Sequence, residues 1–372
     1  MKERKEVEII NDEELIEKFN QAIGIQDKLQ YFSRIRDYNV QMELLSSVPS
    51  NEKYKFIGKI KSTQGIAKAL NNLEDDKAKS KTFNFVAKQF KGNNEGLLRI
   101  ITQIDFDVEL PSNMLTFQIN SLNALNLDFL INIQRHIINH SKMKFKINEK
   151  ESDSTNIEYS FGEMSAIIAK IEELTADIPK DMNEANKFYT IYSRLARIIT
   201  YDHPYLKKHD NAKDKFYHRK GYTNIKNFGY EQYSSYMKDI RRKPAGLYGG
   251  LVEGKSVCAG YALILHEALR YVGLKSQYVV GVEKFGVDGE SHAWTQVQID
   301  GEWYNTDLTW DANTLQIAGR ERYMLLDDET FDISHGKYGL SRTATYHKCT
   351  SKFDYSKIKG QTLTREGIGK EI

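Results

Sequence analysis

The chain has 372 residues, which predicts two domains, and its 53 Lys and Arg against 51 Asp and Glu leave a formal charge of only +2. This balance gives no overall field that would gather nucleic acid or an anionic membrane, and 40% hydrophobic residues exclude a disordered chain. Two cysteines, Cys258 and Cys349, exclude a disulfide framework and indicate a reducing compartment. No apolar segment follows the charged N-terminus, so we expect a cytoplasmic protein with no membrane span and no nucleic-acid partner.

The first part of the chain predicts a series of short amphipathic helices. Asn11 followed by three acidic residues is typical of a helix start, and apolar residues then recur at three- and four-residue intervals. Further helices are predicted at 41–47, 64–73, 96–104 and 122–138. Because almost no strand-like alternation interrupts them, we expect a helical bundle or short helical-repeat domain over 1–150, of unknown partner.

A change of character follows near residue 150. The stretch from Asn148 to Asn156 has no apolar residue, which predicts a domain boundary or a long joint. Amphipathic helices are predicted at 164–174 and 186–199, and 201–243 is a tyrosine- and lysine-rich segment expected to be irregular. We therefore expect a second domain over 151–345, with 346–372 as its partly flexible C-terminal extension.

The segment that begins at Gly254 predicts a helix and then a strand. Apolar residues at helical spacing follow Cys258, and Gly273 is typical of a helix end. Cys258 is therefore expected at a helix N-terminus. A short buried strand is predicted at 277–282.

A β-hairpin is predicted next, with strands at 292–299 and 302–310. Asp300-Gly301 between them is the strongest short-range hairpin signal. A two-residue turn there places His292 opposite Thr309 and Asp307 opposite Trp294. Asp307 is then a diagonal neighbour of His292, close enough to accept the N–H of one ring nitrogen while the other faces outward.

These three residues suggest covalent catalysis. Cysteine is nucleophilic as the thiolate, which helix N–H groups and a neighbouring imidazolium both stabilise. A nucleophile at a helix start (Cys258), a base on a strand (His292) and an orienting acid beyond the hairpin turn (Asp307) form the triad of a cysteine acyl-transfer enzyme.

The residues around this triad resemble the transglutaminase-like superfamily, as a bacterial-type member. Three blocks carry the resemblance: Gly254-Lys-Ser-Val-Cys258-Ala-Gly-Tyr-Ala262, His292-Ala-Trp294, and Gly301-Glu-Trp-Tyr304-Asn-Thr-Asp307-Leu-Thr-Trp-Asp311. The resemblance extends over roughly residues 186–335 and implies an α+β fold. That fold is a papain-like core, with a nucleophile helix packed on an antiparallel sheet, here preceded by an all-α helical domain.

The resemblance also implies an activity. We expect a cysteine-dependent amide hydrolase, peptidase-like or amidase-like, that acts on a protein or peptide through a thioester acyl-enzyme. The alternatives are a protein-glutamine transglutaminase or deamidase and, from another class, a catalytically silent binding scaffold. No cofactor is expected, and no metal, because His266-Glu267 lacks a second histidine and His335 with His347 lacks a third ligand at a suitable spacing.

The oxyanion donors are only partly assigned. Animal transglutaminases use a tryptophan upstream of the cysteine, whereas all three tryptophans of this chain follow Cys258. The backbone N–H of Cys258 is one expected donor, and Tyr222, Gln232 or Tyr248 could supply the other. Trp294 is a further cleft candidate, although such a tryptophan more often packs in a core.

Overall fold

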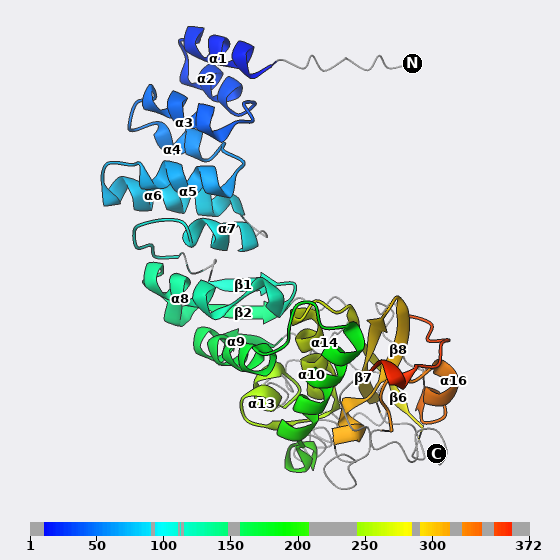
Figure 1. Ribbon diagram of the computed structural model, residues 1–372. Coiled ribbons are helices and arrows are strands. Elements are labelled where there is room, and N and C mark those ends of the chain that lie inside the picture. The colour runs from blue at the N-terminus through cyan, green and yellow to red at the C-terminus, as the bar shows by residue number, and fades with distance from the viewer. Residues whose placement is uncertain are drawn as a thin grey trace, which may run out of the picture. The chain divides into compact units, whose positions relative to one another are not determined.

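The computed structural model describes residues 11–90, 94–110, 112, 115–147, 157–207, 244–284, 291–312, 322–336 and 346–358. The chain divides into two compact units, of which one comprises Met1–Phe117 and Asp128–Met143 and the other Gln118–Leu127 and Lys144–Ile372. Both are coloured by residue number in Figure 1. None of the described helices is both long enough and apolar enough to span a lipid bilayer.

Short helices build the first unit. They are α1 (Asp12–Gln21), α2 (Ile25–Phe32), α3 (Tyr38–Ser46), α4 (Lys53–Ile57), α5 (Thr63–Asn71), α6 (Asp76–Ala87), α7 (Asn94–Ile101) and α8 (Leu127–His136). The first seven follow one another in a stack (Figure 1). Side chains of Asn11, Asp37, Ser62 and Asp75 cap four of them by accepting backbone N–H groups. Because isolated helices of this length are marginal in water, packing between neighbours must stabilise them.

Aromatic side chains form the core at the start of this stack. Phe19, Phe32 and Phe56 are fully buried, and their ring centroids lie 5.3 to 6.3 Å apart. Two of the three ring pairs meet edge to face, which is the favoured arrangement of aromatic quadrupoles. The apolar periodicity of the sequence is thus explained by packing between consecutive helices.

Two details of this region differ from the sequence prediction. The helix predicted from residue 122 starts only at Leu127, because Ser121 caps a separate 3₁₀ turn, η3 (Leu122–Ala124), whose first N–H donates to Glu267. A short strand that the sequence pattern did not predict also occurs, and it shares a sheet with strands that follow this region. β1 (Thr116–Ile119), β2 (Lys144–Ile147) and β3 (Glu158–Ser160) form one sheet in that order. The polar joint at 148–156 lies outside the described residues.

The second unit also contains helices, three of which have 14 or 15 residues. They are α9 (Phe161–Thr175), α10 (Glu184–Ile198), α13 (Leu247–Leu251), α14 (Cys258–Tyr271) and α16 (Asp328–Phe331). A capping box of Ser160 and Glu163 starts α9. The predictions of helices at 164–174 and 186–199 are confirmed to within a few residues. Most of the segment 201–243 lies outside the described residues.

A four-stranded antiparallel sheet completes the second unit, in the order β8-β7-β6-β9. Its strands are β6 (Ser276–Glu283), β7 (Ser291–Ile299), β8 (Glu302–Thr306) and β9 (His335–Gly336). Asp300 and Gly301 both have positive φ, at 51° and 88°, as a two-residue hairpin turn requires. The register pairs Ile299 with Glu302 and Thr295 with Thr306, which confirms the predicted hairpin up to that point.

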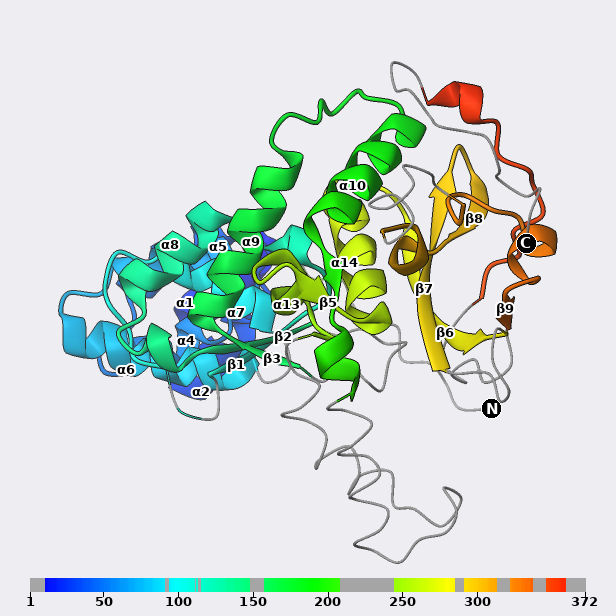
Figure 2. The same cartoon turned by 90° about the horizontal axis from the view of Figure 1, so that it is seen from below.

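Helix α14 packs against β6 and β7 of this sheet (Figures 1 and 2). The hydroxyl of Thr295 on β7 donates to the carbonyl oxygen of Ala262 in α14 at 3.0 Å. Apart from its first turn, α14 is buried on almost every side, as its apolar sequence predicts. The second unit thus combines helices and antiparallel sheet, and it holds the start of α14 beside the strand that bears His292.

Candidate active site

Cys258 is the first residue of α14, as the sequence predicts. Val257 precedes it as an extended N-cap without a side-chain hydrogen bond, so no side chain of the cap covers the helix end. The first N–H groups of a helix have no partner within the helix, and they form the positive end of its dipole. Cys258 is half-buried and lines a pocket, where its thiol meets this end of α14.

A tight turn fixes this helix start. The hydroxyl of Ser256 donates to the carbonyl oxygen of Pro244 at 2.7 Å, and the N–H of Val257 donates to the same oxygen at 3.1 Å. A Cβ added at Gly260 would lie 2.1 Å from Ser256 Oγ and 2.5 Å from Pro244 O. Only glycine fits there without moving backbone, so Gly260 is part of what positions Cys258.

His292 and Asp307 form a buried pair beside the thiol. His292 Nε2 lies 2.7 Å from Asp307 Oδ2, and both side chains are buried. The Cys258 side chain is within hydrogen-bond reach of the same imidazole. Because Nε2 contacts Asp307, we assign the contact with Cys258 to Nδ1, so the His292 ring lies between Cys258 and Asp307.

The way in which Asp307 reaches His292 differs from the prediction. The second hairpin strand was expected to run to Trp310, but β8 ends at Thr306 and the chain becomes helical at 308–312. Asp307 Oδ1 accepts the N–H groups of Thr309 at 2.8 Å and Trp310 at 3.3 Å, so Asp307 caps this turn. The predicted strand pairing of His292 with Thr309 and of Asp307 with Trp294 was therefore wrong, although the predicted contact between His292 and Asp307 is present.

Electrostatics favour an ion pair at this contact. Burial by itself lowers the pKa of His292, but the charge and hydrogen bond of Asp307, with the contact to Cys258, raise it to about 10. Burial by itself raises the pKa of Asp307, but the His292 charge and the hydrogen bonds of two histidines hold it well below its usual range. At neutral pH the pair is therefore imidazolium and carboxylate.

The pocket at the thiol has a volume of about 280 Å³. Cys258 and His292 both line it, so the two reacting side chains can be reached from one side. Its other walls are mainly aromatic and aliphatic, with one acidic side chain among the described residues, and they include Tyr201, Tyr205, Tyr278, Val257, Val280 and Glu283. Such a lining can enclose an apolar or aromatic part of a substrate beside the scissile bond.

Sequence reasoning missed a second histidine at Asp307. His335 is fully buried, and its Nε2 lies 3.1 Å from Asp307 Oδ2, the oxygen that also bonds His292. The ligand atoms of these three side chains all lie within 4.8 Å of one another, as in groups that can hold a metal ion, but here they bond each other. His347, considered with His335 as a metal ligand, instead stacks on Trp303 at 3.7 Å. The two-residue strand β9 has no sequence periodicity that could have revealed His335.

The other candidate residues lie in different places. Trp294 is buried in a core cluster with Val279, Leu326 and Phe331, and it does not line the pocket. Tyr248 lies in α13 and is not among the described pocket residues. Tyr222 and Gln232 lie outside the described residues. The second oxyanion donor thus remains a prediction.

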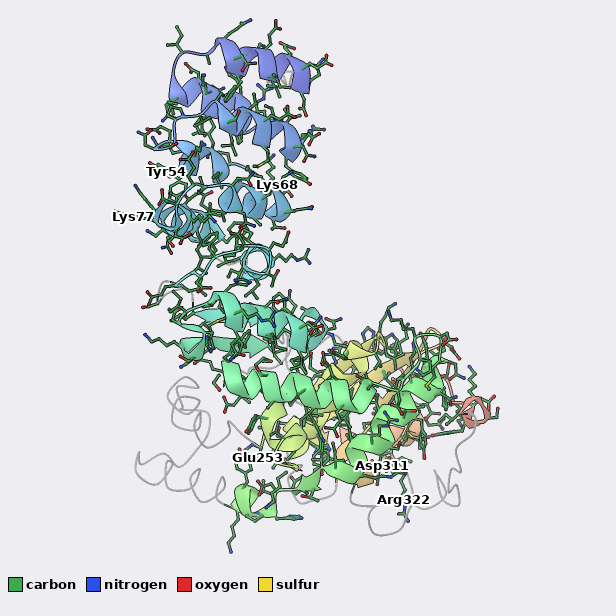
Figure 3. All side chains as sticks on the ribbon, turned by 60° about the vertical axis from the view of Figure 1, so that its left-hand side comes forward. Tyr54, Lys68, Lys77, Glu253, Asp311 and Arg322 are labelled. Carbon is green, nitrogen blue, oxygen red and sulfur yellow. The ribbon has the colours of Figure 1, made fainter. Side chains whose placement is uncertain are left out.

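A second buried carboxyl group lies four residues beyond Asp307. Asp311 accepts the Tyr192 hydroxyl at 2.6 Å and the N–H groups of Arg322 at 2.7 Å and Tyr323 at 3.0 Å. Figure 3 labels Asp311 and Arg322. Burial raises the pKa of Asp311 to about 7, against the opposing effect of these hydrogen bonds. Asp311 thus ties α10 and the segment at Arg322 to the helical turn that Asp307 starts.

Comparison with known proteins agrees with the three sequence blocks. The model of the transglutaminase-like superfamily matches residues 222–308, a range that includes Cys258, His292 and Asp307. This match confirms the resemblance. Enzymes of this superfamily are generally cysteine-dependent, although some members are inactive.

A solved structure described as "Crystal structure of a TGase" is also similar. Its sequence identity is 23% and its TM-score is 0.26; the match covers 40% of this chain and 32% of that one. The chain thus matches about a third of the length of that protein. The search of curated proteins found no match.

Proposed function

We propose that this chain, whose residues 222–308 are transglutaminase-like, is a cysteine-dependent amide hydrolase that acts on a protein or peptide. The observation that supports this most is the continuous contact from thiol to carboxylate. Cys258 at the start of α14 reaches one side of the His292 ring, and buried Asp307 binds the other at 2.7 Å. This is the order of nucleophile, base and orienting acid that acyl transfer requires.

Acylation uses the ion pair directly. Cys258 reacts as the thiolate: its sulfur attacks the carbonyl carbon of the bound amide and forms the new C–S bond, while the carbonyl electron pair moves onto the oxygen. As the tetrahedral intermediate collapses, the C–N bond breaks and His292 Nδ1 gives its proton to the leaving nitrogen. The amine departs and a thioester on Cys258 remains, with neutral His292 still bound to Asp307.

Deacylation reverses the role of the imidazole. Neutral His292 takes a proton from a water molecule while the water oxygen attacks the thioester carbonyl. The C–S bond breaks, the substrate leaves as a carboxylic acid, and Cys258 with His292 regains the starting protonation. If the acyl group came from a glutamine side chain, with ammonia as the leaving group, and a lysine amine took the place of water, the same steps would crosslink two proteins.

The start of α14 stabilises the oxyanion. In this mechanism the backbone N–H of Cys258 donates to the developing oxyanion, and the dipole of the 14-residue helix α14 adds to this stabilisation. Ala259 also lines the pocket. A second donor from Tyr222, Gln232 or Tyr248 is part of this proposal.

The two halves of the chain have different roles in this proposal. A papain-like catalytic core occupies about 151–345, and the helical part at 1–150 recruits a protein substrate or covers the cleft. An isolated core would then keep the reactivity of Cys258, whereas turnover of proteins would change.

The function is tested with dimethylcasein as a general protein substrate. Peptide release, ammonia release and dansylcadaverine incorporation are followed in parallel, since they report hydrolysis, deamidation and crosslinking. We expect peptide release that needs no added amine and disappears in Cys258→Ala. Cys349→Ala is the matched control. Cys349 is buried beside Gln296, so its substitution should leave turnover unchanged.

The products also decide between the alternatives. Dansylcadaverine incorporation without peptide release would show that the enzyme transfers the acyl group to an amine and does not hydrolyse the protein. A third outcome is that none of the three products forms and that Cys258 is alkylated no faster than in a His292→Ala variant. This outcome would contradict an enzyme and favour a binding scaffold.

A further inference from the structure

His335 is the buried group nearest the triad that the proposed mechanism does not use. It lies in β9, whose pairing with the end of β6 places it opposite Glu283. Its Nε2 is 3.1 Å from Asp307 Oδ2, and His292 Nε2 is 2.7 Å from that oxygen. Two imidazoles thus share one oxygen of the orienting carboxylate.

The hydrogen bonds of His335 define its tautomer. Asp307 is a carboxylate and can only accept at this contact, so Nε2 of His335 carries a proton and donates it to Oδ2. Ser334 Oγ lies 2.8 Å from Nδ1 of the same ring and 3.4 Å from the carbonyl oxygen of Phe331, to which it donates. Burial lowers the pKa of His335 below its ordinary value, against the raising effects of Asp307 and of the Phe331 backbone, so a neutral ring with its proton on Nε2 is favoured at pH 7.

Aromatic walls hold the His335 ring in this direction. Phe331 stacks on it with centroids 3.8 Å apart and planes at 16°, and Trp310 lies 4.4 Å away. Trp294 meets the ring edge to face at 5.4 Å. With contacts on several sides, the imidazole cannot turn its donor away from Asp307 without moving these side chains.

Asp307 is therefore held at both oxygens. Oδ1 accepts the backbone N–H groups of Thr309 and Trp310, and Oδ2 accepts both histidines. A carboxylate with four donors has one orientation, and the lone pair that it offers to His292 is fixed in direction.

We propose that His335 is a positioning residue that completes a tetrad of Cys258, His292, Asp307 and His335. It donates a hydrogen bond from its neutral ring to Asp307 and so fixes the carboxylate that aligns His292 with the thiol. This role rests on the proposed cysteine hydrolase function. It also explains why β9, only two residues long, is added to the sheet edge beside β6.

The test compares two substitutions at this position. His335→Phe keeps a ring between Phe331 and Trp310 but removes the donor, whereas His335→Gln replaces the ring by an amide that can donate to Asp307. Val279→Ala is the matched control, because Val279 is buried in the neighbouring core cluster and does not line the pocket. Each variant is assayed for dimethylcasein hydrolysis and for the low-field proton NMR signal of the His292 Nε2–H.

We expect His335→Phe to lower kcat about tenfold to hundredfold with little change in KM, as for partners that orient a metal-bound histidine. The low-field signal should broaden or disappear. His335→Gln should recover most of the rate and keep the signal, and Val279→Ala should match the wild type in both.

Two results would overturn the tetrad: an unchanged rate and signal in His335→Phe, or equal losses in His335→Phe and Val279→Ala. The NMR signal does not depend on turnover. An inactive wild type would therefore overturn the proposed function, while the signal would still decide the role of His335.

Discussion

The two units of the chain differ in which polar groups they bury. Among the described residues, the helical unit buries Gln41, Thr82 and Asn139, none of which ionises. Gln41 donates to two backbone carbonyls, and Asn139 exchanges hydrogen bonds with Leu110. The second unit also buries ionisable side chains, among them Glu267, His292, Asp307, Asp311 and His335.

Because of this difference, we expect substitutions in the two units to affect different properties: the stability of the fold in the helical unit and the reactivity of Cys258 in the second unit. Burying a charge costs free energy unless a partner and hydrogen bonds compensate, and removing one member of a buried pair leaves the other uncompensated. The helical unit avoids this cost, whereas the second unit accepts it around Cys258. Substitutions in the core of the helical unit should therefore change stability and leave the reactivity of Cys258 unchanged, whereas substitutions at the buried pair of His292 and Asp307 should change that reactivity.

The largest effect is expected at the bridging residue. His292→Ala removes both the acid of acylation and the base of deacylation, so turnover should fall by at least about 10⁴-fold. The half-time of Cys258 alkylation by iodoacetamide near pH 6 should lengthen as well, read by intact mass. Turnover within about tenfold of the wild type would show that another group is the base.

Asp307→Asn should come next, with a loss of about 10³- to 10⁴-fold, because an amide permits the wrong imidazole tautomer. The fold should persist, since an amide oxygen can still accept the N–H groups of Thr309 and Trp310 and cap the helical turn. Circular dichroism and turnover measured on the same sample check both statements. Rates near those of the wild type would mean that Asp307 is not the orienting acid.

In the helical unit, Phe56→Ala should cost about 3–5 kcal/mol of unfolding free energy, since it leaves a cavity beside Phe19 and Phe32. Urea unfolding followed by fluorescence measures this loss. The alkylation rate of native Cys258 should not change. Slower alkylation of Cys258 in the folded variant would show that the core of the helical unit also affects the reactivity of the active site.

The smallest effect is expected at a helix cap. Asp75 accepts the N–H of Ala78 at 2.8 Å at the start of α6, so Asp75→Ala should lower the unfolding free energy by about 1 kcal/mol. Glu74→Ala, one residue outside the cap, is the control and should stay within about 0.5 kcal/mol of the wild type. Equal losses in both variants would show that the cap contributes nothing specific.

Local chemistry explains which parts of this structure the sequence could predict. The turn at Asp300-Gly301 sets the hairpin register, and glycine with apolar periodicity sets the start of α14 at Cys258. Asp307 was misplaced because its side chain bonds the next N–H groups and ends β8, a competition that strand periodicity does not contain. His335 could not be predicted, because a two-residue strand brings it to Asp307 from 28 positions away.

The most direct test of the account is the titration of the His292 ring, followed by nitrogen NMR in histidine-labelled protein. Asp307 and Cys258 raise the pKa of His292 above its ordinary 6.5, to about 10, so the imidazolium should persist as the pH rises and deprotonate only near pH 10. In Asp307→Asn the same resonance should titrate at clearly lower pH. A wild-type His292 that loses its proton near pH 6.5 would contradict the ion pair and the mechanism built on it.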